Sequence, residues 1–291
     1  MIDTTNLKEL TIEEHKQMAL NILLEVADFC EKNNFRYFLA YGTLIGAIRH
    51  KGFIPWDDDI DIQMPRPDYE RFAKEFNKKY ADKNLLAIMP PDKNAKHTYM
   101  KICDMNTVKI ENGIRYHSID ETLGVDIDVF PLDGQYENDD RYKKAFNDKK
   151  KLYVKYFQIE CKFFMNDLRF NLSSFLTLIK RFGGILQGRL LTNFSRTWKK
   201  EYLLNEMHKK EVEIPYDSAV MVGTNCSKYD TFNDRHLKTY YDTYTPVTFE
   251  DHTFRAPVGY DAILTKQYGD YMTPPPRKMQ ETHHGSKVYM K

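Results

Sequence analysis

Acidic residues with alternating apolar neighbours are the clearest chemical signal of this 291-residue chain. Asp59 and Asp61 flank Ile60, at the end of an acidic run that begins at Asp57. Successive side chains of a β-strand point to opposite faces, so this spacing predicts two carboxylates on one face. Like charges held that close repel unless a cation lies between them. The pattern therefore indicates a hard divalent cation, as in enzymes that transfer phosphoryl groups.

A second segment repeats the alternation of apolar and acidic residues. Asp126 and Asp128 lie between Val125, Ile127 and Val129, so a strand here also turns both carboxylates to one face. A solvated strand face that carries acids is the alternative interpretation. Two such segments in one chain, each beside turn residues, favour a shared acidic site. The alternation leaves open which of the two aspartates supplies the third carboxylate.

Candidate phosphate contacts lie on both sides of the first acidic run. Gly42 allows close approach of a phosphate, and a helix that begins at Thr43 would offer free N–H groups. An isolated Gly-Thr pair would indicate an ordinary strand-to-helix turn, but its place about 16 residues before the acids favours the phosphate contact. Arg49, followed by His50, is the best cationic candidate because a guanidinium binds phosphate oxygens in pairs. Lys101 alternates with apolar residues and is either a second phosphate contact or part of a solvated face.

Four further residues are candidates for substrate contact. Trp56 could stack on a base, cradle a quaternary ammonium group, or fix the loop as a core residue. Arg277 adds positive charge near the end of the chain. His283 and His284 lack a third or fourth zinc ligand at suitable spacing, so a general-base or substrate-contact role fits better than a metal site. An ordinary polar tail is the alternative for this pair.

Composition and charge indicate a soluble globular protein. Hydrophobic residues make up 42% and charged residues 29% of the chain. The net charge of +1 argues against a nucleic-acid partner, which usually requires a strong positive excess. The four cysteines are far apart, which predicts reduced, mostly buried thiols and no structural zinc. Without an apolar leader or a run of about 20 apolar residues, we expect a cytoplasmic protein.

The order of the expected elements is that of an α+β protein. A capping box at Thr11 starts a helix that ends near Asn33. Strands are expected at residues 37–40, 59–64, 85–89, 99–103, 107–111 and 125–130, the last ending at Pro131, with helices at 44–48 and 67–80. A hairpin that turns at Asp251-His252 and a helix at 260–268 follow. We divide the chain into a catalytic core (1–137), a helical insertion (138–215) and a segment that completes the core and the site (216–291).

Within the insertion, residues 170–200 combine apolar residues at helical spacing with basic residues and no acids. One interpretation is a helical cap that packs on the core. The other is an interfacial helix on an anionic membrane, which would place the protein peripherally at the inner face of the plasma membrane.

The acidic run and its flanks resemble the LicD family, which includes lipopolysaccharide and teichoic-acid phosphocholine transferases and has fukutin-type relatives. The resemblance rests on several runs that match in order: Tyr41-Gly42-Thr43, Ile45-Gly46-Ala47, Arg49-His50, 52–56, 57–61, 268–272 and His283-His284. It implies a core similar to the nucleotidyltransferase fold of DNA polymerase beta. The family pattern before Phe-Pro-Leu-Asp assigns the third acid to Asp128, with Asp126 in reserve. The resemblance is weakest between residues 138 and 220.

By this resemblance, Asp59, Asp61 and Asp128 hold Mg²⁺, or Mn²⁺ in its place. The implied donor is a CDP-linked alcohol, above all CDP-choline. The implied acceptor is a hydroxyl of a cell-surface glycan precursor of teichoic acid, lipopolysaccharide or capsule, and CMP leaves. One alternative is a nucleotidyltransferase that uses an NTP and releases pyrophosphate. Another is an inactive binding module, against which the intact acids argue, because buried paired acids are costly without a cation.

Overall fold

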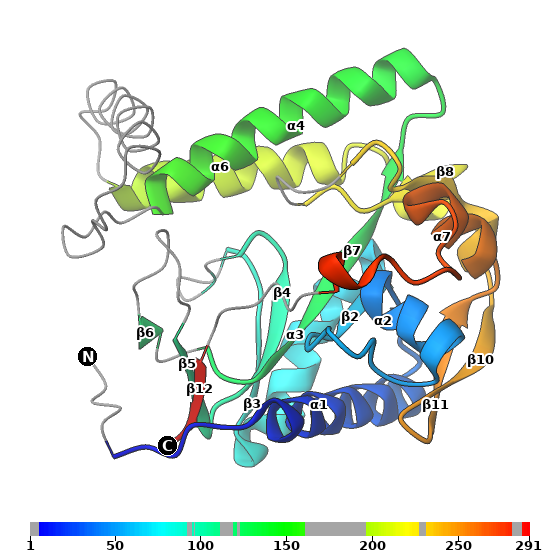
Figure 1. Cartoon of the computed structure of the whole chain (residues 1–291). Helices are drawn as coiled ribbons and strands as arrows, with labels where there is room; N and C mark the ends of the chain where they lie inside the picture. The colour runs from blue at the N-terminus through cyan, green and yellow to red at the C-terminus, as the bar shows by residue number, and fades with distance from the viewer. Residues whose placement is uncertain are drawn as a thin grey trace, which may run out of the picture.

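The computed structural model describes residues 6–91, 95, 97–110, 119–120, 123–160, 196–226, 231–280 and 287–291. Helices and runs of strands are interspersed along the chain around a central mixed sheet (Figure 1). The expected α+β class is confirmed. The three-part division at residues 137/138 and 215/216 stays a prediction.

The central sheet has the order β1-β2-β7-β4-β3, and β8 and β9 extend it from the end of β7. Among the described strand pairs of this sheet, only β2–β7 is parallel, and the others are antiparallel. These strands span Phe38–Leu39 (β1), Asp61–Pro65 (β2), Leu85–Ile88 (β3), Met100–Asp104 (β4), Asp126–Gln135 (β7), Met221–Gly223 (β8) and Arg235–Leu237 (β9). Because β7 lies between β2 and β4, the two acidic segments of the sequence become neighbours.

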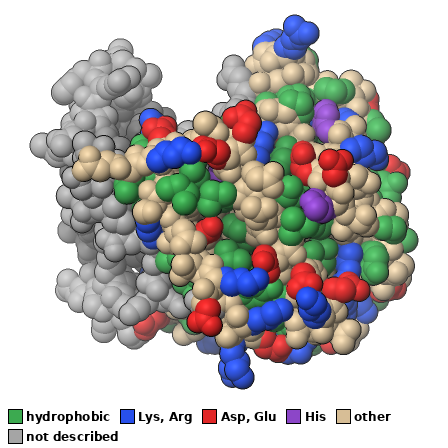
Figure 2. Space-filling model, turned by 90° about the horizontal axis from the view of Figure 1, so that it is seen from below, with side chains coloured by type: hydrophobic (Ala, Val, Ile, Leu, Met, Phe, Trp, Pro, Cys, Tyr) green, Lys and Arg blue, Asp and Glu red, His purple; other side chains and the backbone are tan. Residues whose placement is uncertain are grey.

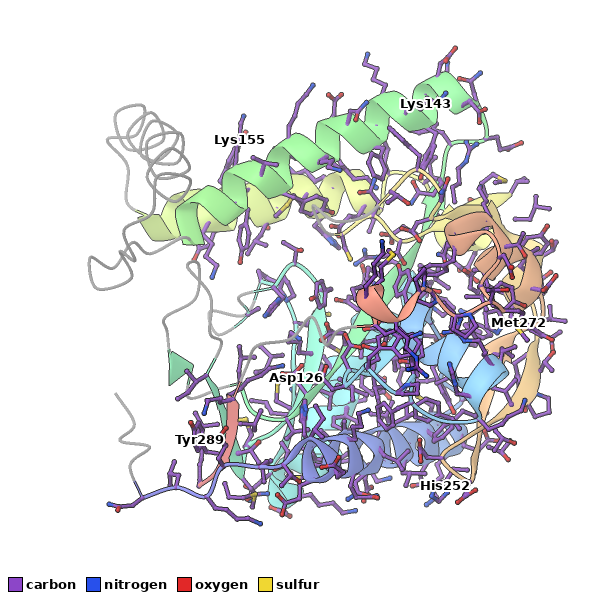
Figure 3. The ribbon with its side chains drawn as sticks, in the orientation of Figure 1. Asp126, Lys143, Lys155, His252, Met272 and Tyr289 are labelled. Atoms are coloured by element: carbon purple, nitrogen blue, oxygen red, sulfur yellow. The ribbon has the colours of Figure 1, made fainter. Side chains whose placement is uncertain are left out.

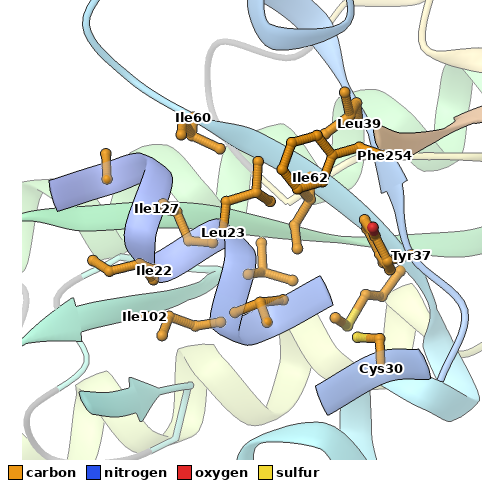
Figure 4. Packing of buried hydrophobic residues seen from close by; sticks show 14 of the residues in the cluster. Ile22, Leu23, Cys30, Tyr37, Leu39, Ile60, Ile62, Ile102, Ile127 and Phe254 are labelled. Carbon is orange, nitrogen blue, oxygen red and sulfur yellow. The ribbon is translucent and has the colours of Figure 1, made fainter. Parts of the chain in front are cut away.

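One face of this sheet is covered by α1 (Ile12–Asn33) and α3 (Arg66–Tyr80). Ile62, Ile102 and Ile127 from three neighbouring strands pack with Ile22 and Leu23 of α1 in the main core (Figure 4). The capping box at Thr11 that starts α1 is present. Since side chains alternate along a strand, the acids between these isoleucines must point to the opposite face.

Two strand boundaries differ from the sequence expectation by more than one residue. β2 begins at Asp61, so Asp59 precedes the strand. The chain before it turns, with the Asp57 N–H donating to the Ile54 carbonyl at 2.9 Å. β7 continues through Pro131 to Gln135, and the proline carbonyl accepts a hydrogen bond from the Thr224 hydroxyl at 3.1 Å.

A hairpin and a short helix support the segment between β1 and β2. That segment contains α2 (Tyr41–Ile45) and a π-helical turn (Gly46–His50). The hairpin of β10 (Tyr244–Phe249) and β11 (His252–Pro257) turns at Glu250 and Asp251, both with positive φ, one residue earlier than expected. The Glu250 carboxylate accepts a hydrogen bond from the Phe53 N–H at 2.9 Å, which fixes the hairpin against residues 51–53. Helix α7 (Tyr260–Tyr268) ends at Gly269 as expected.

The last residues of the chain return to the first half of the fold. β12 (Lys287–Met290) pairs with β5 (Thr107–Ile110), and β5 also pairs with β6 (Ile119–Asp120). Tyr289 of β12 forms a bridge to Glu9 near the start of the chain (Figure 3). The remaining short helical turns are η2 (Ala81–Lys83), η4 (Tyr216–Ser218), η5 (Lys238–Tyr241) and η6 (Arg277–Met279).

Two long helices, α4 (Asp139–Glu160) and α6 (Arg196–Glu211), lie side by side as an outer layer (Figure 1). A buried ion-pair network attaches them to the sheet. Arg66 donates to Asp133 at 2.6 and 2.8 Å and to Glu211 of α6 at 3.0 Å, and the Tyr153 hydroxyl of α4 donates to Glu211 at 2.7 Å. Lys143 and Lys155 of α4 point away from the sheet (Figure 3). Residues 161–195, which carry most of the basic apolar segment 170–200, lie outside the described residues.

The distribution of surface charge and the burial of the cysteines agree with what the composition predicted. The face seen in Figure 2 intersperses Lys and Arg with Asp and Glu. Of the cysteines, Cys30, Cys103 and Cys226 are free and buried, and Cys161 lies outside the described residues. Among the helices that the structure describes, none is both long and apolar enough to cross a membrane.

Candidate active site

Strand register brings the acids of the two segments together. Asp61 and Asp128 are Cα partners in the parallel β2–β7 ladder, and Lys101 is the partner of Asp128 in the antiparallel β4–β7 ladder. Neighbouring strands lie about 4.8 Å apart. Two carboxylates and one ammonium therefore share one row across three strands, on the face opposite α1.

The electrostatics of Asp61 show that four acids share this region. Burial raises the pKa of Asp61 well above its usual value, and the negative charges of Asp59, Asp128 and Asp57 raise it further. Lys101 opposes this shift without cancelling it. Burial also raises the pKa of Asp128. Asp59, although outside the strand, is thus close enough to act on Asp61, and the group disfavours carrying all its negative charges at once.

Lys101 lies between two of the carboxylates. Its Nζ donates to Asp126 Oδ1 at 2.8 Å and also to Asp128. Lys109 Nζ lies 3.1 Å from the other oxygen of Asp126. Burial acts to lower the pKa of Lys101, but the charges of Asp126 and Asp128 outweigh it and raise that pKa well above the usual value. Burial likewise acts against the Asp126 carboxylate, yet Lys101 and Lys109 hold its pKa well below the usual range.

Asp126 and Asp128 therefore have different environments despite their shared face. Asp126 is satisfied by two ammonium groups, while Asp128 shares one of them and faces Asp61. This asymmetry favours Asp128 as the reactive acid and gives Asp126 the role of holding Lys101. A phosphate contact by Lys101 stays a prediction, and its ammonium already has two carboxylate partners.

We expect Lys101→Met to destabilise the metal-free protein by about 3–5 kcal/mol, because it leaves two buried carboxylates without their shared cation. Chemical denaturation measures this loss. Asp126 keeps Lys109 as a partner, so Asp128 is the carboxylate left without a cation, and the double variant Lys101→Met/Asp128→Asn should regain part of the stability. Equal stability of the single variant and the wild type would contradict the buried ion-pair assignment.

Residues of the turn between β1 and β2 contact the acidic residues directly. α2 begins at Tyr41, which has a positive φ of 45°, and so earlier than residues 43 and 44, where the sequence suggested a helix start. Thr43 Oγ1 accepts a hydrogen bond from the Asp61 N–H at 2.8 Å. A Cβ on Gly42 would lie 2.6 Å from Asp57 Oδ2, so only glycine leaves that carboxylate in place. Gly42 and Thr43 thus shape the acidic cluster, and their contact with a phosphate stays a prediction.

Arg49 joins the π-helical turn to the chain after α7. Its guanidinium donates to the Tyr271 carbonyl at 2.5 Å and to His50 Nε2 at 2.9 Å. Burial, together with the Arg49 charge, lowers the pKa of His50. The His50 and Trp56 rings meet edge to face at 6.2 Å, and Trp56 is half-buried against the main core. Substrate contacts by these residues stay predictions.

The C-terminal candidates are less defined. Arg277 is exposed on η6. His283 and His284 lie outside the described residues.

Sequence reasoning missed the polar and aromatic side chains beside the acids. Gln63, two residues after Asp61, donates to Thr224 Oγ1 at 2.9 Å and so links β2 to the chain after β8. Phe130, two residues after Asp128, packs against Tyr99 and Tyr41. The same alternation that identified the acids could have identified Gln63 and Phe130, because i and i+2 share a face.

The donor chemistry of this face fits a hard cation, because crowded carboxylate oxygens are the ligands that Mg²⁺ and Mn²⁺ prefer. Burial and the neighbouring acids raise the pKa of Asp61, so a cation beside its carboxylate would be favoured. Within the described ranges, however, no three Asp, Glu, His or Cys side chains converge as a ready-made metal site. Asp128 instead bonds Lys101.

Comparisons with known proteins agree with this arrangement. Residues 34–171 match the family described as "LicD/FKTN/FKRP, nucleotidyltransferase domain", a range that includes Lys101 and all the clustered acids. The chain is 30% identical to the "Lipopolysaccharide cholinephosphotransferase LicD" of Haemophilus influenzae, over 98% of this chain and 100% of that protein. It is also 28% identical to "Mannosyltransferase regulator 4" of Saccharomyces cerevisiae, over 41% of this chain but 10% of the yeast protein. The match that runs through both chains end to end, and the acids gathered within the matched domain, show that this chain belongs to the LicD family.

Proposed function

We propose that this chain transfers phosphocholine from CDP-choline to a hydroxyl of a cell-surface glycan precursor and releases CMP. Its family membership makes it a phosphotransferase. The full-length similarity to a lipopolysaccharide cholinephosphotransferase supports choline as the alcohol and lipopolysaccharide as the acceptor class, with teichoic acid or capsule as related acceptors. The observation that carries the proposal is the row Asp61–Asp128–Lys101 across three neighbouring strands.

The proposal includes a core of the nucleotidyltransferase type, similar to DNA polymerase beta. A glycine-containing turn before one acidic strand and a third acid on the neighbouring strand support it. It also includes Mg²⁺, or Mn²⁺, held by Asp59, Asp61 and Asp128. When bound, the ion would neutralise the phosphate oxygens and the acids around Asp61.

The chain's own residues would perform the remaining steps. One carboxylate of the cluster accepts the proton of the acceptor hydroxyl, whose oxygen then attacks the phosphorus that bears choline. The bond from that phosphorus to the oxygen of CMP breaks, and CMP leaves with the electron pair. Lys101 offsets negative charge beside Asp128, while Thr43 holds the backbone of Asp61 in position. Positioning and charge neutralisation supply most of the rate in such transfers.

Product analysis tests the proposal against its alternatives. The protein is incubated with Mg²⁺, a glycan acceptor and either CDP-choline, CDP-ethanolamine, CDP-glycerol or an NTP. CMP release with CDP-choline, together with phosphocholine on the acceptor, is the expected result. Pyrophosphate release from an NTP would identify a nucleotidyltransferase instead. No turnover of any donor, together with no Mg²⁺ binding by calorimetry, would identify a binding module.

Peripheral membrane contact through residues 170–200 stays part of the proposal. Each basic residue near an anionic surface contributes on the order of 1 kcal/mol, so several together hold a soluble protein there reversibly. We expect co-sedimentation with anionic vesicles at low salt and release at high salt, because salt screens these contacts. Protein that stays in the supernatant at low salt would show that the segment does not bind membranes.

A further inference from the structure

The sheet face that carries the acids also carries aromatic rings, one side-chain position further along. Phe130 follows Asp128 by two residues on β7 and therefore shares its face. Its ring centroid lies 4.5 Å from that of Tyr99, which immediately precedes β4, and 5.3 Å from that of Tyr41 at the start of α2. We refer to Tyr41, Tyr99 and Phe130 as the aromatic cluster.

The three rings do not stack flat on one another. The Tyr41 ring is almost perpendicular to Phe130, at 88°, and the Tyr99 ring is inclined to it by 40°. Phe130 is buried, whereas Tyr41 and Tyr99 are half-buried and so accessible in part. The accessible parts of Tyr41 and Tyr99 include aromatic ring surface, and a ring face attracts an organic cation that lies within about 6 Å of its centroid.

The cluster also lies in the negative field of the acids. Burial raises the pKa of Tyr99 well above its usual value, and the charges of Asp128 and Asp61 raise it further. The Tyr99 ring already has one cation nearby, since Lys101 Nζ lies 5.7 Å from its centroid. A quaternary ammonium group has no N–H to donate, so ring faces and nearby negative charge are the interactions that can recognise it.

The spacing along the strand is close to the reach of a phosphocholine group. Two residues of a strand span about 7 Å, which separates the row of Asp61 and Asp128 from the row of Phe130. In phosphocholine, one oxygen and two carbons lie between the phosphorus and the nitrogen. A donor with its reacting phosphorus beside the acids would therefore bring its nitrogen to the aromatic cluster. The cytosine of the same donor lies much further from that phosphorus, beyond a second phosphate and a ribose.

We propose that the aromatic cluster binds the quaternary ammonium of the donor and so selects choline over alcohols that carry no positive charge. This subsite rests on the proposed phosphocholine transfer and deepens it. Trp56, which the sequence offered for the same task, packs against His50 and the main core instead.

Calorimetric titration with CDP-choline, CDP-glycerol and CMP tests the subsite, in the presence of Mg²⁺. Tyr99→Leu and Phe130→Leu should each weaken CDP-choline binding by roughly 3- to 30-fold, which is the usual range for one cation–π contact. Binding of CDP-glycerol and CMP should stay within twofold of wild type. Tyr99→Phe keeps the ring and should bind CDP-choline like wild type. Phe146→Leu is the matched control, because Phe146 is a buried ring on α4 that contacts Phe232 at 4.5 Å, and it should change none of the three affinities.

Other results would contradict the proposed subsite, and each would indicate a different binding mode. Equal weakening of CMP and CDP-choline would show that the rings stack on cytosine. Loss of choline preference in Trp56→Leu, with Tyr99→Leu unaffected, would assign the headgroup to Trp56 and leave the proposed function intact. Wild-type protein that binds CDP-choline no more tightly than CDP-glycerol would refute the choline donor itself. If Phe130→Leu does not fold, the half-buried Tyr99→Leu decides the matter.

Discussion

Asp61→Asn should reduce phosphocholine transfer by on the order of 10³-fold, the usual effect of removing one group that stabilises transition-state charge. Asp59→Asn should lose activity comparably, because its charge acts on the same group. Neither change alters the shape of the side chain, so both variants should fold. The measurement is CMP release from CDP-choline at saturating Mg²⁺, with far-ultraviolet circular dichroism as the check on folding.

The stability of Asp61→Asn should move in the opposite direction from its activity. Folding raises the pKa of Asp61, so ionised Asp61 destabilises the folded, metal-free protein above its unfolded pKa of about 3.9. At pH 7 Asp61→Asn should therefore be at least as stable as wild type. At pH 3, where both states of the wild type are largely protonated, the difference should disappear. Near-normal activity, or a clear loss of stability at pH 7, would contradict the role of Asp61 as a crowded reactive acid.

Asp128→Asn and Asp126→Asn should show crossed effects, although the two residues are neighbours on one strand face. Asp128→Asn should lose activity by on the order of 10³-fold, like Asp61→Asn, because Asp128 faces Asp61 across the β2–β7 ladder. Asp126→Asn should lose only about 10- to 100-fold, since it acts through the position of Lys101.

Stability should follow the reverse order. Folding lowers the pKa of Asp126, so its carboxylate stabilises the protein above its unfolded pKa, and this contribution is lost as the pH falls. Asp126→Asn should therefore destabilise by about 3 kcal/mol at pH 7, as expected when a buried ion pair loses one partner. Asp128→Asn should be less destabilised, because folding raises the pKa of Asp128. Steady-state kinetics measures the activity of both variants, and urea denaturation measures their stability. A larger loss of activity in Asp126→Asn than in Asp128→Asn would show that Asp126 is the reactive acid.

Local signals in the sequence predicted most of the elements. The capping box at Thr11 and Gly269 marked helix ends correctly, because caps are satisfied by residues within a few positions. The alternation of apolar and acidic residues predicted which side chains of residues 126–130 face the core. This pattern failed at Asp59, which lies between the turn at residues 54–57 and the start of β2 and so is not part of the strand. The prediction that a strand ends at a proline failed at Pro131, because β7 continues to Gln135.

The sequence by itself determined that this chain carries two strand segments with acids on one face and buried apolar residues on the other. It also determined the family to which such segments belong. Only the tertiary structure decided how the carboxylates differ. Asp126 and Asp128 are equivalent in the local pattern, but Lys109 from β5 reaches Asp126, whereas Asp61 from β2 faces Asp128. The physical reason is that strand register joins residues far apart in sequence. The charges that such neighbours bring then set the ionisation, and hence the chemistry, of each acid.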